Sequence, residues 1–169
     1  PDQREARGDP AILFQLLEGA RQAVGPVLLA DGARRVDTVL LAEELLRARF
    51  GAVPDVGGAL APPIRDSTEA FDLMLQAADG CGYAGRVRLG IDVAASELFV
   101  EANGTYRIGG EQLVPEALAQ RYMALADAYP LVFIEDPFHE DDFASHAALT
   151  AALPSGVLVV GDDLFVSHP

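Results

Sequence analysis

The sequence contains no lysine and no tryptophan, and its 12 basic residues are all arginine. Without lysine, this chain cannot form a Schiff base with a substrate or supply a lysine as general base. Acidic residues outnumber basic ones by 26 to 12, and the net charge of −14 argues against a nucleic-acid partner, because phosphate neutralisation needs a basic surface. The single cysteine, Cys81, excludes an internal disulfide framework and is typical of the reducing cytoplasm.

Long hydrophobic runs are also missing, since Arg and Asp interrupt each apolar stretch before it reaches the roughly 18 residues of a membrane span. The polar first residues, 1–5, do not resemble a signal peptide. Half of the residues are nonetheless apolar, and the mean hydropathy is +0.20, which is typical of a folded chain. The 169 residues suffice for one domain with its own core. We therefore expect a folded cytoplasmic protein with no membrane partner.

Helical and extended patterns alternate along the chain. Helical spacing of apolar residues predicts helices at 13–20, 36–50, 66–78, 115–128 and 142–152. Short strands are predicted at 27–29 and on both sides of Asn103-Gly104, a strong hairpin signal. The segment 52–65 is rich in Gly and Pro, as in a loop. This alternation favours an α/β fold with a parallel sheet.

Three further predicted strands each end in an acidic residue. These strands finish at Asp92, at Glu135 and, after a glycine, at Asp162. In a parallel α/β barrel the C-terminal ends of the strands meet on one face, so the three carboxylates can converge there. Convergent carboxylates form a hard-oxygen site suited to Mg²⁺.

Each of these acids has a simpler interpretation, because Asp or Glu after a strand often caps the next helix or solvates a turn. Three in succession, each after an apolar strand, favour a shared site instead. Asp136, Asp142 and Asp163 have weaker claims as ligands, and we expect them to orient ligands, cap helices or face solvent. His139 has two interpretations, a contact with the substrate or a position in a solvated loop, and the loop is favoured. His146 is expected at a surface or partly packed helix position.

The segments around these acids resemble the signature segments of the enolase family. They occur in the family's order and at about its spacing, and from Tyr83 to Pro169 the chain is similar to enolase throughout. The segments are Gly90-Ile91-Asp92-Val93-Ala94-Ala95-Ser96-Glu97, Ile134-Glu135-Asp136-Pro137-Phe138 with Asp141-Asp142, and Val160-Gly161-Asp162-Asp163-Leu164.

The resemblance implies that Asp92, Glu135 and Asp162 are the carboxylate ligands of Mg²⁺, and that Glu135 and Asp162 also lie at the substrate. It implies a carbon–oxygen lyase of glycolysis that dehydrates 2-phosphoglycerate to phosphoenolpyruvate, and a homodimer. No residue of this chain is assigned as catalytic.

The chain departs from the family pattern in its catalytic loop. Pro54-Asp55-Val56-Gly57-Gly58 aligns with a family loop that reads Gly-Asp-Glu-Gly-Gly, so Val56 stands where enolases have a catalytic glutamate. The family's second acidic residue has no convincing counterpart, and Gly25-Pro26-Val27 lies near its place. The family's lysines, and its phosphate-contacting arginine and serine, fall after the stretch that corresponds to Ser167-His168-Pro169.

The sequence thus predicts an α/β fold, a partial TIM-like barrel of the enolase type that is incomplete at both ends, because a full barrel needs about 250 residues. Residues 1–35 form a poorly matching lead-in, expected to be a helix plus a short strand, and residues 36–169 form the partial barrel domain with the metal-ligand strands. The expected function is that of an enolase segment that is inactive alone. The alternative is a non-catalytic, enolase-like protein, a pseudoenzyme or truncated form, that binds metal or another protein. A third interpretation, an unrelated acidic α/β domain, is not favoured, because it would require the three ordered motifs to occur by coincidence.

Overall fold

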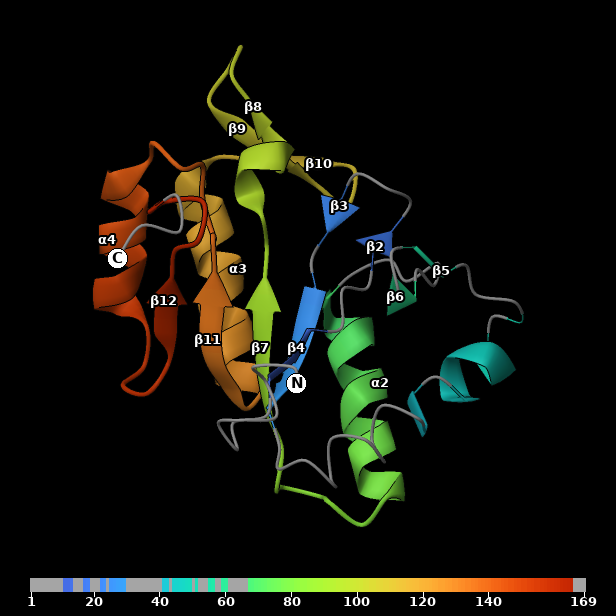
Figure 1. Ribbon diagram of the computed structural model, residues 1–169. Coiled ribbons are helices and arrows are strands. Elements are labelled where there is room, and N and C mark those ends of the chain that lie inside the picture. The colour runs from blue at the N-terminus through green and yellow to red at the C-terminus, as the bar shows by residue number, and fades with distance from the viewer. Residues whose placement is uncertain are drawn as a thin grey trace.

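A five-stranded sheet forms the centre of the molecule (Figure 1). The computed structural model describes residues 11–13, 17–18, 22–23, 25–29, 41–42, 44–49, 51, 55–56, 59–60 and 67–165. Within them the strand order is β1-β4-β7-β11-β12. The strands are β1 (Ala11–Leu13), β4 (Gly25–Leu29), β7 (Arg88–Asp92), β11 (Leu131–Glu135) and β12 (Leu158–Val160).

The three acid-bearing strands, β7, β11 and β12, run parallel, whereas β4 is antiparallel to β7 and β1 is antiparallel to β4. The expectation of parallel strands therefore holds for these three and fails for β4. Between β4 and β7 the chain passes through helical residues 44–49 and then α2 (Ser67–Gly80). One α-helix lies between the parallel strands β7 and β11.

The helices start and end where the local chemistry predicts. In the helix α3 (Pro115–Ala128), proline stands in the first turn, where no backbone donor is needed. In α4 (Phe143–Ala152), the Asp142 carboxylate caps the helix by accepting the Ser145 N–H at 3.1 Å. The helical residues 44–49 are followed by Gly51 at φ +76°, as expected for a C-terminal glycine. Residues 36–40, 43 and 50 of that predicted helix lie outside the described residues.

Small sheets flank the central one. The Asn103-Gly104 hairpin joins β8 (Phe99–Val100) to β9 (Thr105–Ile108), as predicted, and β10 (Glu111–Leu113) adds a strand that the sequence did not indicate. A 3-10 helix, η2 (Ala95–Leu98), connects β7 to this sheet. The strands β5 (Asp55–Val56) and β6 (Ala59–Leu60) form a separate hairpin inside the segment predicted as a loop.

The helix expected at residues 13–20 is wrong. The described residues of this segment are 13, in β1, and 17–18, which form β2 (Leu17–Glu18); β3 (Gln22–Ala23) follows it. Ala11, Ile12 and Leu13 pair with Leu29, Leu28 and Val27 of β4. An apolar stripe in so short a segment suits either structure, and here pairing with a neighbouring strand overrides the helical spacing. The short strand expected at 27–29 is confirmed as part of β4, and the boundary at residue 35 stays a prediction.

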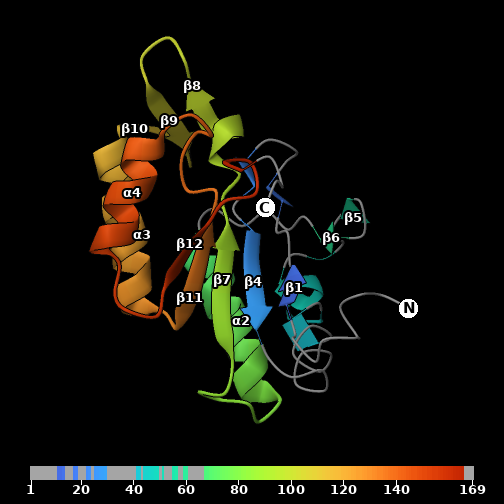
Figure 2. The ribbon, with the colours of Figure 1, turned by 60° about the vertical axis from the view of Figure 1, so that its left-hand side comes forward.

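The two faces of the central sheet differ. Helices cover one face: α2 packs on β4, α3 on β11, and α4 on both β12 and α3, as Figure 2 shows for the last pair. Leu89, Ile91 and Ile134 lie in this core with side chains from α2 and α3. The other face carries Gly90, Phe133 and Leu158 in one row of paired residues, with Asp92, Glu135 and Val160 in the next row. We call these six residues the open face, because Leu158 and Val160 are 64% and 36% exposed.

Rows of side chains across parallel strands are the arrangement that fills the inside of an α/β barrel. The described strands do not close a barrel, since β1 and β12 are the two ends of the sheet. The fold is therefore a part of a barrel, with the helices outside, the open face inside, and Asp92 and Glu135 at one rim.

Gly90 lets the Phe133 ring lie across β7. A Cβ at this position would stand 2.4–2.8 Å from three atoms of that ring. We expect Gly90→Ala to lower the free energy of unfolding by about 1–3 kcal/mol, the usual cost of forcing a packed site apart. Urea denaturation measures the change. The double variant Gly90→Ala/Phe133→Val should cost less than the sum of the single variants, because the smaller side chain removes the clash. A loss within about 0.5 kcal/mol for Gly90→Ala alone would contradict the close contact.

Candidate metal centre

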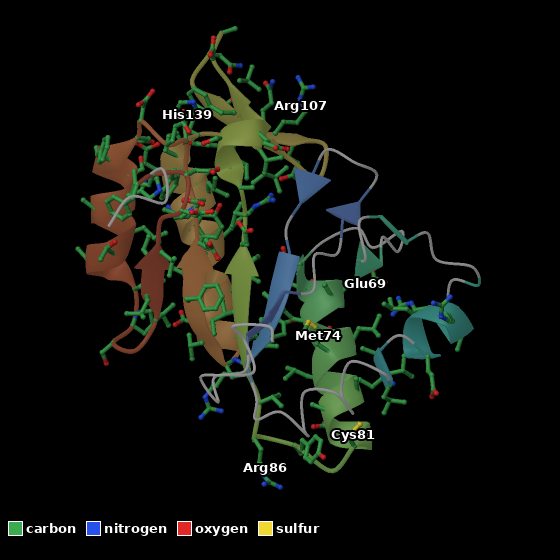
Figure 3. The ribbon with its side chains drawn as sticks, viewed as in Figure 1. Glu69, Met74, Cys81, Arg86, Arg107 and His139 are labelled. Carbon is green, nitrogen blue, oxygen red and sulfur yellow. The ribbon has the colours of Figure 1, made fainter. Side chains whose placement is uncertain are left out.

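The three acids predicted as ligands lie at the same end of three adjacent parallel strands. Asp92 is the last residue of β7 and Glu135 the last of β11, and the two are paired in register. Asp162 follows β12 by two residues. Asp92 and Glu135 are half-buried and Asp162 is exposed. Figure 3 shows His139 at this end of the sheet, with Cys81 and Arg86 at the opposite end, so the lone cysteine is remote from the acids.

The carboxylates destabilise one another's charged forms. Burial, followed by the charges of Asp92 and Asp136, raises the pKa of Glu135 to about 7. Burial is also the main cause that raises the pKa of Asp92 to about 6, with Asp136 contributing and an N–H bond from Ala94 opposing. The pKa of Asp163 is raised as well, by burial and then by Asp136. Negative charge therefore gathers at this rim at neutral pH, where a bound cation would relieve the repulsion.

Backbone hydrogen bonds join the loops that follow the strands. The Val93 N–H donates to Glu135 O at 3.0 Å, and the Ala94 N–H donates to Asp92 Oδ1 at 3.1 Å. Ala94 adopts φ +45°, a left-handed conformation that is uncommon for a residue with a side chain. The Asp92 carboxylate thus helps to fix the conformation of the turn that follows β7.

His139 lies in a loop, as the sequence suggested, and is half-buried there against aromatic side chains. Its N–H donates to Tyr106 Oη at 2.9 Å, and its ring packs on Phe99 with centroids 4.6 Å apart. The Asp141 N–H donates to His139 Nδ1 at 3.2 Å, so this nitrogen acts as an acceptor. Tyr106 comes from the β8–β9 hairpin, and no local pattern in the sequence links it to His139.

The weaker ligand candidates, Asp136, Asp142 and Asp163, have different environments in the structure. Asp142 caps α4, as one of its predicted roles required. Asp136 does not face solvent: it is 3% exposed, and its carboxylate accepts backbone N–H groups from residues 162–164. Asp163 is half-buried. Sequence reasoning found the three acids at the strand ends but did not distinguish the roles of the neighbouring aspartates.

Mg²⁺ fits the chemistry of this rim, because hard carboxylate oxygens are its preferred protein ligands. Burial first, and then the charges of neighbouring acids, raises the pKa values of Asp92 and Glu135, so their charged forms are disfavoured there. In the part of the chain that the structure describes, however, no three Asp, Glu, His or Cys side chains are arranged to hold one ion together. A shared ion between Asp92, Glu135 and Asp162 therefore stays a prediction.

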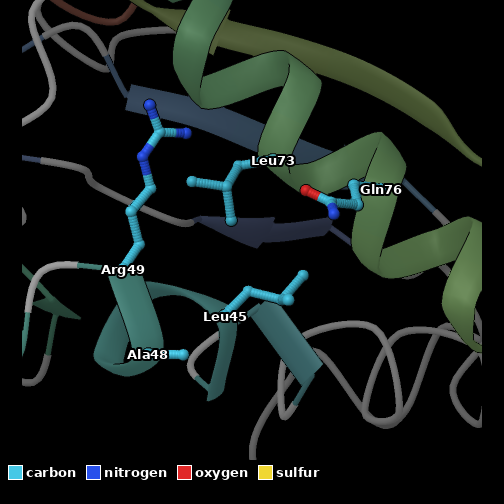
Figure 4. Close-up of a pocket in the computed structure, with 5 residues that line it drawn as sticks. All are labelled: Leu45, Ala48, Arg49, Leu73 and Gln76. Atoms are coloured by element: carbon cyan, nitrogen blue, oxygen red, sulfur yellow. The ribbon is translucent and has the colours of Figure 1, made fainter.

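A pocket between helical residues 44–49 and α2 lies apart from these acids (Figure 4). It is lined by Leu45, Ala48, Arg49, Leu73 and Gln76, with no acidic residue among them. Arg49 pairs at the exposed edge with Glu69. Among the described helices, none is long and apolar enough to cross a membrane.

Helices cover one face of the sheet, and acids lie where its parallel strands end. This arrangement defines the chain as part of an α/β barrel with its candidate site on the C-terminal rim. Residues 36–169 match the family described as the enolase C-terminal TIM barrel domain. The chain belongs to the enolase family.

Similar proteins include three curated enolases. The enolase of Methanopyrus kandleri is 41% identical over 79% of this chain and 33% of its own length. That of Methanocaldococcus jannaschii is 45% identical over 69% of this chain and 26% of its own. That of Eimeria tenella is 35% identical over 95% of this chain and 42% of its own, and so extends into the first 35 residues. The chain thus spans from about a quarter to two fifths of these relatives.

Proposed function

We propose that this chain is the Mg²⁺-binding segment of an enolase-type carbon–oxygen lyase, in which Asp92, Glu135 and Asp162 hold the ion, and that the chain alone does not complete the reaction. The substrate of such an enzyme is 2-phosphoglycerate and the product is phosphoenolpyruvate. The observation that carries the proposal is the alignment of acids at the ends of β7, β11 and β12, within a chain that belongs to the enolase family. By the same family inference, we propose a cytoplasmic, glycolytic role and a homodimer.

The residues of this chain have separate tasks in this proposal. Asp92, Glu135 and Asp162 would hold Mg²⁺, and Glu135 and Asp162 would also lie against the substrate. Bound Mg²⁺ would supply positive charge that stabilises the negative charge developing on the substrate carboxylate as a proton is lost. The raised pKa of Glu135, about 7, keeps part of its population protonated at neutral pH in the absence of a cation, so binding of the ion should release protons.

The groups that would move the substrate's protons are missing from this chain. No lysine is present to take the carbon-bound proton, and Val56, in β5, has no proton to give to a leaving hydroxide. General acid and base groups each contribute typically 10²–10⁴-fold to a rate. These two absences also favour the second candidate function, a non-catalytic enolase-like protein that retains metal or protein binding.

We expect no phosphoenolpyruvate when the purified chain is incubated with 2-phosphoglycerate and Mg²⁺, and none with the variant Val56→Glu. Catalytic groups of this kind act as a unit, so restoring the acid without a base should not restore turnover. ³¹P NMR checks this directly, because it follows substrate, product and weak binding in one sample. We expect a Mg²⁺-dependent change in the substrate signal that is lost in Asp162→Asn.

Either of two results would contradict the proposal. Enolase-like turnover by the chain or by Val56→Glu, in samples free of host enzyme, would mean that the catalytic groups are misassigned. A substrate signal that changes equally with and without Mg²⁺ would separate any substrate binding from the metal centre.

A further inference from the structure

We propose that Asp136 is a positioning residue, which sets Asp162 against the ends of β7 and β11 and does not itself bind the ion. The role in metal binding rests on the proposed function, whereas the anchoring of Asp162 can be tested without it.

The Asp136 carboxylate accepts hydrogen bonds from the backbone that follows β12. Oδ1 accepts the N–H groups of Asp162 at 3.1 Å and Leu164 at 3.5 Å. Oδ2 accepts the N–H groups of Asp162 at 3.2 Å and Asp163 at 3.0 Å. Successive N–H groups that converge on one anion form a nest, which here encloses a carboxylate of the chain itself. The backbone of Asp162 is therefore held by both oxygens of one side chain.

The backbone of Asp136 joins the other two loops. Its N–H donates to Val160 O at 2.9 Å, and its carbonyl accepts the Ala95 N–H at 3.0 Å. Through Ala95 it contacts the loop after β7, and through Val160 the end of β12. One residue thus connects the segments that carry all three predicted ligands, Glu135 being its neighbour in the chain.

Asp136 is arranged as an anchor and not as a ligand. It is 3% exposed, and three backbone N–H groups make four contacts with its carboxylate, which has about four lone-pair sites. It also adopts φ +41°, a left-handed conformation that Asp and Asn tolerate better than most residues. Its neighbour Glu135 has no such set of N–H partners among the described contacts, and so keeps oxygens that can face an ion.

Gly161 gives independent support for a fixed turn at Asp162. A Cβ on Gly161 would lie 2.8 Å from Leu164 Cβ and 3.1 Å from atoms of Leu164 and Phe165. The turn after β12 therefore folds back closely on Gly161. The Asp136 carboxylate accepts the N–H groups of residues 162–164 in this same turn. A displacement of either residue should move Asp162.

The test compares Asp136→Asn with Asp141→Asn. Asparagine keeps the size and the tolerance for positive φ, but its NH₂ group replaces one acceptor and faces the N–H donors. Asp141 is exposed two residues after His139, and its substitution removes the same charge near the site without touching the turn. Amide hydrogen exchange at residues 162–164, read by NMR without metal, reports the anchor. Calorimetric titration with Mg²⁺ reports the consequence for the site.

We expect faster exchange at all three amides in Asp136→Asn and a loss of Mg²⁺ affinity of about 10- to 100-fold, the usual effect of removing a group that orients a ligand. Asp141→Asn should match the wild type in both measurements. If Asp136→Asn fails to fold, Gly161→Ala shifts the same turn with Asp136 intact, and it should also weaken Mg²⁺ binding. A destabilised fold alone would not produce a loss of affinity measured well below the melting temperature.

The outcomes separate the two proposals. Unchanged exchange at residues 162–164, or wild-type Mg²⁺ affinity in Asp136→Asn, would overturn the positioning role even if the wild type binds Mg²⁺. A wild type that binds no Mg²⁺ would overturn the proposed metal centre and the part of this inference that depends on it, and the exchange data would still decide whether Asp136 anchors Asp162.

Discussion

Millimolar Mg²⁺ should raise the thermal unfolding midpoint of this chain at pH 8. An ion that binds only the folded state stabilises it by mass action, by about 2.7 kcal/mol at a concentration 100 times the dissociation constant. For a chain of this size, that corresponds to roughly 5–10 °C. The effect is expected to be large because Asp92 and Glu135 carry charge that burial and neighbouring acids disfavour. Calorimetry or circular dichroism, with and without Mg²⁺, measures the shift.

Two glutamate variants make this result specific. Glu135→Gln should abolish the shift, because the substitution removes one ligand and the charge at the end of β11. Glu116→Gln removes the same charge from an exposed position in the first turn of α3 and should keep the full shift. An equal shift in Glu135→Gln, or no shift in the wild type, would count against the metal centre.

Without Mg²⁺, the chain should lose stability as the pH rises from about 4 to about 7. Glu135 and Asp92 have folded-state pKa values raised to about 7 and about 6, from ordinary values of 4.5 and 3.8. Between these values the folded state binds more protons than the unfolded state, so the free energy of unfolding falls with increasing pH. Asp163, whose pKa is also raised, contributes in the same direction.

Urea denaturation at pH 5, 6, 7 and 8 measures this slope, and Glu135→Gln isolates its cause. The variant should lose the part of the slope between pH 5 and 7 that belongs to Glu135, and without metal it should be more stable than the wild type at pH 8. Mg²⁺ should reverse the ranking, because only the wild type gains a bound ion. If the wild type and the variant show the same pH dependence, the pKa of Glu135 is not raised in the folded state.

The strands that carry the candidate site could be predicted from the sequence. An apolar run that ends in an acid is a local pattern, and β7 and β11 end at the predicted residues, Asp92 and Glu135. The helix α3 was predicted with its observed bounds, since Pro115 marks its start and the helical spacing continues to Ala128. Such elements are specified by residues within one short window.

The parts that failed depend on contacts between distant residues. The strands β1 and β2 stand where a helix was predicted, because β1 pairs with β4 and β2 with β3. For Asp136 the sequence left three roles open, namely orienting a ligand, capping a helix or facing solvent, because the N–H groups that hold it lie 26–28 positions later in the chain. Neither partner could be identified from its own neighbours in sequence.

His146 shows the same limit inside a correctly predicted helix. It was expected at a surface or partly packed position, but it is 4% exposed and its ring lies 5.4 Å from that of Phe138. Its Nδ1 lies 2.9 Å from the Asp142 carbonyl, and its Nε2 is buried without a hydrogen-bond partner among the described residues. The sequence predicted the helix, but the packing of Phe138 against it determined which face is inside.

The most direct test of the metal centre is anomalous X-ray scattering from a crystal of the chain grown with Mn²⁺, which prefers the same hard oxygen ligands as Mg²⁺. We predict one strong anomalous peak at the rim of the sheet, bound by carboxylate oxygens of Asp92, Glu135 and Asp162, with Asp136 still on the backbone of residues 162–164. No peak at that rim, or a peak bound by other residues while these three carboxylates stay apart, would contradict the account.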